Sequence, residues 1–421
     1  MYNSGSRERA TRTKQIVIPT KQTRSILASA RPALLGATAV FLALLGIVTL
    51  AVKLWRLVGD PGPLGAIDIK ILYFLTRSWF EGIPIYERLA EGVTYPPASF
   101  AILWPAYGWL TLDRARVLWA IVDLAALVAL SGLFWRAVRF GGRLAQLCAA
   151  LAPFSMPALA DALGIGQLTI VVLPLAVGAV LLAARENPVW RRDIVAAAMF
   201  VCALVKPSLV APFFIPLLIV PRRARPAALV IVGYGLLTWL ASRFQPGSLP
   251  TQLRGWRKHV AGNSGAGYGN VQDWLAQLGW PNVFPVVSLL LLAGLAIFTW
   301  RYRRIDVWLL LGVAAIVARL WTYHRVYDDG LLIVAMIALA RLAAEPQAVP
   351  WVVWSVRVTL ITSAIVLWIP LQFHYVGSTF GPLLVMPSWV TLFNVAHAAV
   401  FVLTLIVLIA AGRASATPPA Q

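Results

Sequence analysis

Charged residues and cysteines are scarce in this chain. Only 12% of its 421 residues are charged, and only two are cysteines, Cys148 and Cys202. A soluble domain has roughly 25% charged residues. So little charge, combined with 60% hydrophobic residues, excludes an ordinary water-soluble enzyme, and the apolar content excludes a disordered chain. Both cysteines lie inside apolar runs, so no disulfide framework is expected.

Long apolar runs are what the chain has instead. Ala33–Val52 and Val395–Ala411 approach the roughly 20 residues that a membrane-spanning helix needs. Similar runs recur along the whole sequence. They predict an all-α fold, that of a polytopic helical membrane protein.

The net charge of +20, from 36 Lys and Arg against 16 Asp and Glu, would suggest nucleic acid as the partner of a soluble protein. Here the basic residues cluster between apolar runs, as they do in the cytoplasmic loops of membrane proteins. No nucleic-acid partner is therefore expected. Residues 1–32 read as a basic cytoplasmic arm before a retained first helix, because no cleavage site follows the first apolar run.

Placing every basic cluster in the cytoplasm yields about twelve crossings with both termini inside. Residues 33–411 then form one transmembrane domain, and residues 412–421 form a cytoplasmic tail. Two long loops lie outside, at about 58–97 and 243–282. The expected spans are 33–57, 115–135, 144–160, 165–184, 193–205, 208–220, 227–242, 283–300, 306–320, 330–344, 350–370 and 389–411.

Three segments depart from a simple crossing. Residues 99–110 are apolar but short, which indicates a re-entrant or interfacial helix. Residues 193–205 and 208–220 are also too short to span fully. They meet at Lys206-Pro207, and irregular backbone at membrane depth is tolerated only where it lies beside a cavity or inside protein. The first outer loop alternates aliphatic, aromatic and charged residues, which predicts an amphipathic helix on the outer interface.

Acidic residues fall mostly in the outer loops or at outer helix ends in this topology. Because the positive-inside rule barely constrains acids, this bias favours chemistry on the outer face. Asp68 opens the amphipathic stretch, where an Asp is also a common helix N-cap. Lys206, between two short apolar helices, needs an anion or a cavity, unless its ammonium reaches the membrane surface.

The run from Arg319 to Asp329 holds two arginines and a histidine beside aromatic residues. These side chains are suited to a phosphate and a sugar face, although arginines and aromatics also anchor helices at the interface. The adjacent acids Asp328 and Asp329 point in different directions on a helix, so no metal site is assigned.

Several short motifs occur in an order that resembles glycosyltransferase family 87. They are Asp68, Tyr73, Trp79, Gly82-Ile-Pro84-Ile-Tyr86, Tyr95-Pro96-Pro97, Gly166-Gln167 and Lys206-Pro207. The resemblance covers about residues 67–220 through motifs and the remainder through topology. The family comprises polytopic enzymes of the GT-C superfamily, among them mycobacterial mannosyl- and arabinofuranosyltransferases. The second outer loop departs from the family pattern, because Asn263 and Asn270 flank a longer segment than the compact Asn-Gln-Ser of many relatives.

This resemblance implies an inverting glycosyltransferase of the plasma membrane with its active site on the outer face. It would move mannose, arabinofuranose or another hexose or pentose from a polyprenyl-phosphate donor to an envelope glycan or glycolipid. Asp68 would be the catalytic base, with Asp60, Asp161 and Asp328 in reserve, and Lys206 would stabilise the departing phosphate. No cofactor is expected. The further expected contacts are Arg319, His324 and Arg325 for the donor phosphate, and Tyr73, Tyr86, Tyr95, Gln167, Asn263 and Asn270 for the substrates.

A lipid or small-solute transporter, such as a flippase, is the alternative function. Broken helices and charges at membrane depth are also transporter features. However, the chain has no evident inverted repeat, and its candidate charges lie at outer helix ends and not at the midplane. A non-catalytic subunit of an envelope complex is a third interpretation, which leaves Asp68 and Lys206 without a role.

Overall fold

The computed structural model describes residues 21–88, 93–187, 189–221, 223–262, 271–344, 350–368 and 387–416. All regular secondary structure in these ranges is helical, which confirms the predicted all-α class. The α-helices are α1 (Lys21–Leu54), α2 (Ile67–Phe80), α3 (Ile85–Arg88), α4 (Pro97–Tyr107), α5 (Leu112–Ala137), α6 (Arg143–Ser155), α7 (Pro157–Ile165), α8 (Thr169–Ala183), α9 (Trp190–Ala203), α10 (Pro207–Ile219), α11 (Arg225–Ser242), α12 (Leu249–Gly262), α13 (Val271–Gln277), α14 (Phe284–Arg301), α15 (Val307–Leu320), α16 (Leu332–Ala344), α17 (Pro350–Leu367) and α19 (Pro387–Ala416).

Five of the described helices are long and apolar enough to cross a membrane, and the bent pair α6–α7 makes a sixth candidate. The five segments are Pro32–Gly59, Leu112–Ala137, Arg225–Ser242, Pro281–Arg301 and Ala396–Ala414. They expose large apolar side chains such as Phe41, Leu236 and Leu289. Surface of this kind is disfavoured in water but suited to lipid. The chain is a membrane protein; the count of twelve crossings remains a prediction.

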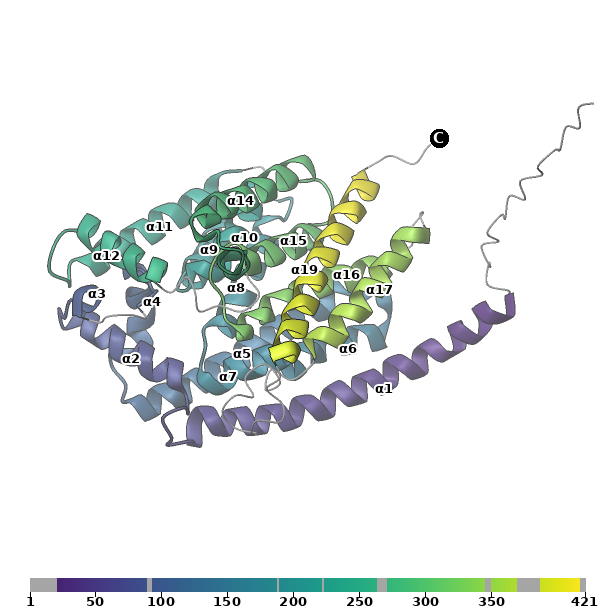
Figure 1. Ribbon diagram of the computed structural model, residues 1–421, viewed down its shortest axis with the longest axis horizontal. Coiled ribbons are helices and arrows are strands. Elements are labelled where there is room, and N and C mark those ends of the chain that lie inside the picture. The colour runs from purple at the N-terminus through teal and green to yellow at the C-terminus, as the bar shows by residue number, and fades with distance from the viewer. Residues whose placement is uncertain are drawn as a thin grey trace, which may run out of the picture.

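The centre of the bundle consists of shorter helices that are apolar on every side. In α15 every residue from Trp308 to Leu320 is buried, which is the pattern of a helix surrounded by others. It packs against α10 and α16, and Figure 1 shows these helices enclosed by the longer ones. The long helix α1 runs along one side of the bundle, where it contacts α6 and α7.

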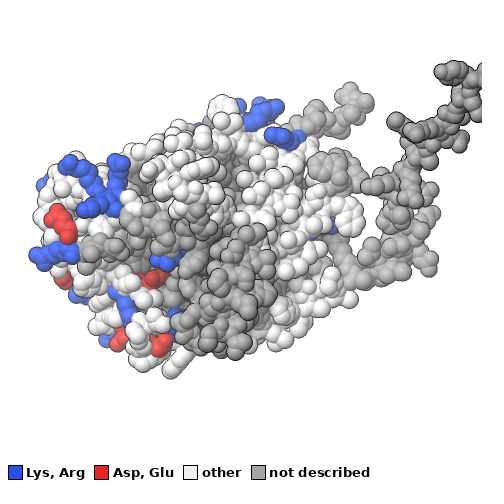
Figure 2. Space-filling model, in the orientation of Figure 1, with Lys and Arg blue, Asp and Glu red and all other residues white. Residues whose placement is uncertain are grey.

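One end of the molecule is built from α2, α3, α4 and α12 (Figure 1). The Trp79 indole in α2 donates to the carbonyl of Ala241 at the end of α11, 2.9 Å away. The Trp256 indole in α12 donates to the carbonyl of Thr94 at 2.8 Å. Figure 2 shows that most charged side chains visible in this view gather at this end, where acids and bases are mixed.

The breaks between short helices differ from the expected spans in an informative way. The expected span 144–160 is bent by 40° between α6 and α7, because Met156 is extended and Pro157 begins a new helix. The next helix starts at Thr169 and not at residue 165. Gly166 lies between them, with a φ of +74° that ends α7.

Gly166 also allows α7 and α2 to approach closely. A Cβ at this position would lie 2.2 Å from Cγ1 of Ile69, which is one residue after Asp68. Two features of this position thus require a glycine. The backbone is left-handed, and the helix that carries Asp68 leaves no room for a Cβ atom.

Gly166→Ala should lower stability more than Gly279→Ala. Gly279 has a similar φ of +79° but open space around it, so its substitution costs only the backbone strain of about 1–2 kcal/mol. At position 166 the clash with Ile69 adds about 1–3 kcal/mol. Thermal unfolding of both purified variants in detergent measures the difference. Equal losses would contradict the close approach of α7 and α2.

Candidate active site

Asp68 lies in the first turn of α2 but does not cap it. The N-cap is Ala66, whose backbone is left-handed (φ 51°, ψ 37°) and has no side-chain cap. The Asp68 carboxylate faces the turn between α7 and α8, where its Oδ2 accepts a hydrogen bond of 2.8 Å from Nε2 of Gln167. The capping interpretation of Asp68 is therefore not supported.

The chain leading to Asp68 is held by a buried arginine of α5. The Arg116 guanidinium donates to the carbonyl oxygens of Leu57 and Asp60, each at 2.7 Å. Leu57 lies in the π-helical segment Trp55–Gly59 that continues α1, and Asp60 is its C-cap. A cation at a helix C-terminus compensates carbonyls that have no partner in the helix. This contact fixes where α1 ends and where α2 begins.

Gln167 presents a defined face of its amide to Asp68. Its Oε1 accepts from the backbone N–H of Leu168 at 2.8 Å, so the NH₂ group is the part that remains for Asp68. The side chain is only 3% exposed. The predicted Gly-Gln motif therefore brings a neutral donor, and no cation, to the Asp68 carboxylate.

Lys206 is buried and paired with Asp328. Its Nζ lies 3.1 Å from Oδ1 of Asp328 and 5.2 Å from the centre of the Tyr327 ring. Lys206 is the N-cap of α10, ahead of Pro207. Because its ammonium points into the protein, the alternative in which it reaches the membrane surface is wrong.

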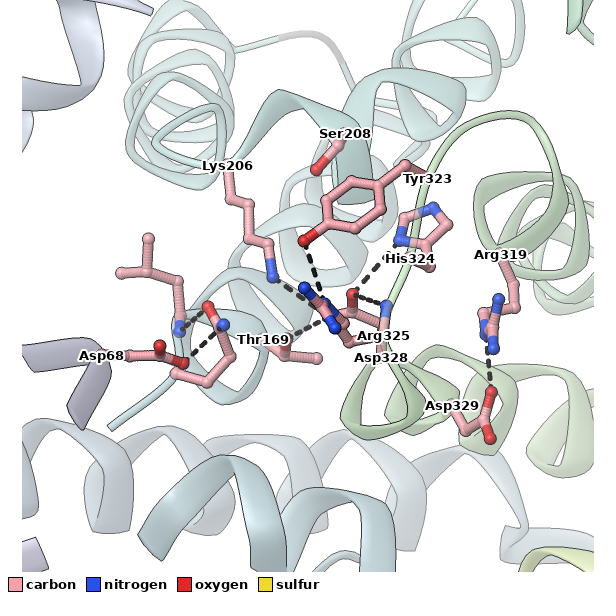
Figure 3. Close-up of polar contacts among 12 residues, drawn as sticks. Asp68, Thr169, Lys206, Ser208, Arg319, Tyr323, His324, Arg325, Asp328 and Asp329 are labelled. Atoms are coloured by element: carbon pink, nitrogen blue, oxygen red, sulfur yellow. Dashed lines mark hydrogen bonds and ion pairs between the residues drawn. The ribbon is translucent and has the colours of Figure 1, made fainter. Parts of the chain in front are cut away.

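Asp328 collects donors from three parts of the chain (Figure 3). Besides Lys206, the Thr169 hydroxyl at the start of α8 donates to Oδ1 at 2.8 Å. Oδ2 lies 3.3 Å from Nδ1 of His324 and accepts from the backbone N–H of Arg325 at 3.1 Å. This one carboxylate joins α8, the start of α10 and the segment after α15.

Asp329 faces a different direction, as expected for adjacent acids. Its Oδ1 pairs with Nε of Arg319 at 2.6 Å, and its Oδ2 lies 3.6 Å from Nε2 of His397 in α19. Arg319 is 2% exposed, and its guanidinium lies over the ring of Phe401. Arg319 and Asp329 therefore connect the site to α19, at some distance from Asp68 in Figure 3.

The environments of Asp68 and Asp328 shift their pKa values in opposite directions. Burial raises the pKa of Asp68 to about 6, and Lys206 only partly offsets this effect. Burial would also raise the pKa of Asp328, but Lys206, the His324 hydrogen bond and the Arg325 amide together hold that pKa well below its usual range. Burial lowers the pKa of His324 despite the neighbouring Asp328, so His324 is neutral at pH 7.

The predicted tyrosines separate into two groups. Burial raises the pKa of Tyr95, and the charges of Asp68, Tyr323 and Asp328 raise it further. Tyr86 instead donates to the backbone carbonyl of Tyr95 at 2.6 Å, and Tyr73 donates to the carbonyl of Leu110 at 2.9 Å. These two hydroxyls hold the framework around the site. Asn263 and Asn270 lie outside the described residues.

The structure adds residues that sequence reasoning did not place in the site. Asp328 was only a reserve candidate for the base, His397 was interpreted as structural, and Thr169 and Asp329 had no assigned role. The Asp328-Asp329 pair beside arginine and histidine was a visible signal, whereas an apolar helix beginning at Thr169 carried none. Of the other reserve bases, Asp161 pairs with Lys53, and Asp60 accepts from the amide of Gly62.

Breaking the buried ion pair should be costly, and removing both charges should be less so. Lys206→Met leaves the Asp328 carboxylate without its cation, which should lower the free energy of unfolding by roughly 2–4 kcal/mol. Asp328→Asn added to Lys206→Met should recover part of this loss. Thermal unfolding of the two single variants and the double variant tests the pair; additive losses would argue against the interaction.

Comparison with known proteins identifies a family. The family model of glycosyltransferase family 87 matches residues 94–346, a range that includes Tyr95, Gln167, Lys206 and the run from Arg319 to Asp329 but not Asp68. Neither a curated protein nor a solved structure gives a significant match. The match covers more than half of the chain and includes Gln167, Lys206 and Asp328 of the site. This membrane protein therefore belongs to glycosyltransferase family 87.

Proposed function

We propose that this glycosyltransferase takes its sugar from a polyprenyl-phosphate donor and transfers it, with inversion, to a glycan or glycolipid of the cell envelope. Mannose, arabinofuranose or another hexose or pentose would be the sugar. The supporting observation is the pair of carboxylates in one site with opposite environments. Two acids whose pKa values are pushed apart usually have different roles.

Asp68 is the group suited to be the base. A pKa of about 6 leaves it mostly ionised at pH 7 and still basic enough to take a proton, which is the range expected of a general base. Its only side-chain hydrogen-bond partner among the described residues is the neutral amide of Gln167. Asp328, with four donors and a pKa below its usual range, is a poor base.

The proposed step balances without a second acid. The acceptor hydroxyl oxygen forms a bond to the anomeric carbon while Asp68 takes its proton. The bond between that carbon and the phosphate oxygen breaks, and polyprenyl phosphate leaves as an anion that needs no proton. Lys206 and Arg325 would stabilise the charge on this phosphate. His324 and Arg319 would support them through Asp328 and Asp329.

The substrates would be held by Tyr95 and Gln167, with Tyr73 and Tyr86 further away and Asn263 and Asn270 on the acceptor side. The site would face the outer side of the plasma membrane, where lipid-linked sugars meet envelope acceptors. In this arrangement α2 lies on the outer surface, and the chain crosses the membrane about twelve times.

Asp68→Asn should abolish transfer and leave the fold intact. The amide keeps the shape of the carboxylate but cannot take a proton, and loss of a general base costs roughly 10²–10⁴-fold in rate. Transfer of labelled sugar from a polyprenyl-phospho-sugar to membrane acceptors measures the rate, and thermal unfolding measures the fold. Asp60→Asn is the control, because the oxygen of the new amide can still accept from the backbone N–H of Gly62. Near-native transfer by Asp68→Asn would return Asp68 to a structural role.

The donor class has its own test. Purified enzyme in lipid should transfer from a polyprenyl-phospho-sugar in the presence of a metal chelator, because the proposed leaving group is stabilised by Lys206 and Arg325 and not by a metal ion. Mannosyl and arabinofuranosyl donors would be compared side by side with the corresponding nucleotide sugars. Turnover with a nucleotide sugar alone would reject the proposed donor.

Reporter fusions test the topology. A fusion at Gly141, between α5 and α6, should report the cytoplasm, and a fusion at Gly262, the last residue of α12, should report the outer side. Periplasmic alkaline phosphatase and cytoplasmic fluorescent protein give complementary signals. Gly141 outside or Gly262 inside would contradict the proposed orientation of the site.

A further inference from the structure

Asp328 forms an ion pair with Lys206, whose charge also acts on the proposed base. The Lys206 ammonium is 3.1 Å from Asp328, and its charge also acts on Asp68. The Lys206 ammonium therefore has two candidate carboxylate partners, and it forms its ion pair with Asp328. The partner that the Asp68 carboxylate contacts is the neutral amide of Gln167.

Resting on the proposed function, we propose that Asp328 is a positioning residue whose carboxylate engages the Lys206 ammonium, so that this cation is kept for the donor phosphate and is not paired with Asp68. Asp328 does not touch the reacting atoms in this proposal. It acts through Lys206, and its own position is fixed by Thr169, His324 and the backbone amide of Arg325.

The rigidity of Asp328 supports this role. Its two oxygens take four donors, and the residue is only 2% exposed. These four contacts hold the Asp328 carboxylate in one orientation. The Asp68 carboxylate is held less firmly, because it has a single side-chain hydrogen-bond partner among the described residues. A lysine side chain is flexible and follows the better-held anion.

The charged groups that face Asp68 come from each element around it. Lys206 at the start of α10 and Arg325 after α15 lower the pKa of Asp68, while burial and the charge of Asp328 raise it. Gln167, between α7 and α8, contributes a neutral donor, and Tyr95 is an uncharged neighbour. Removing the charge of Asp328 should therefore lower the pKa of Asp68 in two ways. It removes a negative charge that raises this pKa, and it frees Lys206 to pair with the Asp68 carboxylate.

Carbodiimide labelling measures this effect without any substrate. Dicyclohexylcarbodiimide modifies carboxyl groups in apolar sites only when they are protonated, and mass spectrometry of the Asp68 peptide gives the extent at each pH. In the wild-type protein, labelling should fall with a midpoint near pH 6. In Asp328→Asn the midpoint should move down by about one pH unit or more, the size of shift that a close opposite charge causes.

Asp329→Asn is the matched control. Asp329 is the neighbouring residue, is equally buried at 2% exposure, and pairs with Arg319 and His397 in place of Lys206. Its substitution should destabilise the protein but leave the Asp68 midpoint where it is. An unchanged midpoint in Asp328→Asn, or the same shift in both variants, would overturn the proposal.

A second readout separates positioning from a general loss of structure. Binding of undecaprenyl phosphate, used as a sugar-free probe, should become weaker in Asp328→Asn by on the order of tenfold, because Lys206 then pairs with Asp68 and is lost to the phosphate. Adding Asp68→Asn removes that competing partner and should restore binding, so equally weak binding in the double variant would indicate disruption of the site and would overturn the proposal.

If Asp328→Asn does not fold, the same labelling compares Lys206→Met with the double variant. In the Lys206→Met background, Asp328→Asn should shift the midpoint by less than half of one pH unit, roughly, because only direct repulsion remains. A shift of a full unit there would show that Lys206 is not the intermediary and would overturn the proposal. Failure of the base assignment is detected separately, since transfer by Asp68→Asn would persist whatever the labelling shows.

Discussion

The buried Asp328 carboxylate imposes the constraint on which the arrangement of this site depends. A charged group inside an apolar helix bundle is stable only when its hydrogen bonds and its charge are compensated. Here the compensation comes from Thr169, Lys206, His324 and the amide of Arg325. The surrounding helices are apolar on every side and would tolerate sliding, so this directional polar contact fixes the ends of α8, α10 and α15 relative to one another.

Short and broken helices make such a site possible. A continuous membrane helix satisfies its own backbone and presents only side chains, whereas a helix end places polar atoms inside the bundle. The chain breaks at Gly166, at Lys206 and after Leu320, and each break supplies a residue to the cluster. The hydroxyl of Ser99 in α4 donates to the carbonyl of Val205 at 2.8 Å, so the Lys206 turn is also tied to the end of the molecule that carries α2.

Asp68 and Asp328 illustrate how one residue type acquires two characters. Asp328 is surrounded by donors and has a pKa below its usual range, while Asp68 faces a neutral amide and has a pKa of about 6. The difference arises from which neighbours reach each carboxylate. Asp329, the residue after Asp328, pairs with Arg319 and also with His397 of α19. This contact extends beyond residues 94–346, so the C-terminal helix adjoins a site built mainly from the family region.

The sequence by itself determined the all-α membrane class, the short helices on both sides of Lys206 and the motif order that indicated the family. These features depend on local composition and spacing, which a single segment carries. Only the tertiary structure decided that Asp68 is not a helix cap, that Lys206 points inward, and that Asp328, not Asp68, is the ion-pair partner of Lys206. Those outcomes depend on contacts between residues about 100 or more positions apart, and hydrophobic periodicity contains no information about which polar groups meet when apolar helices pack.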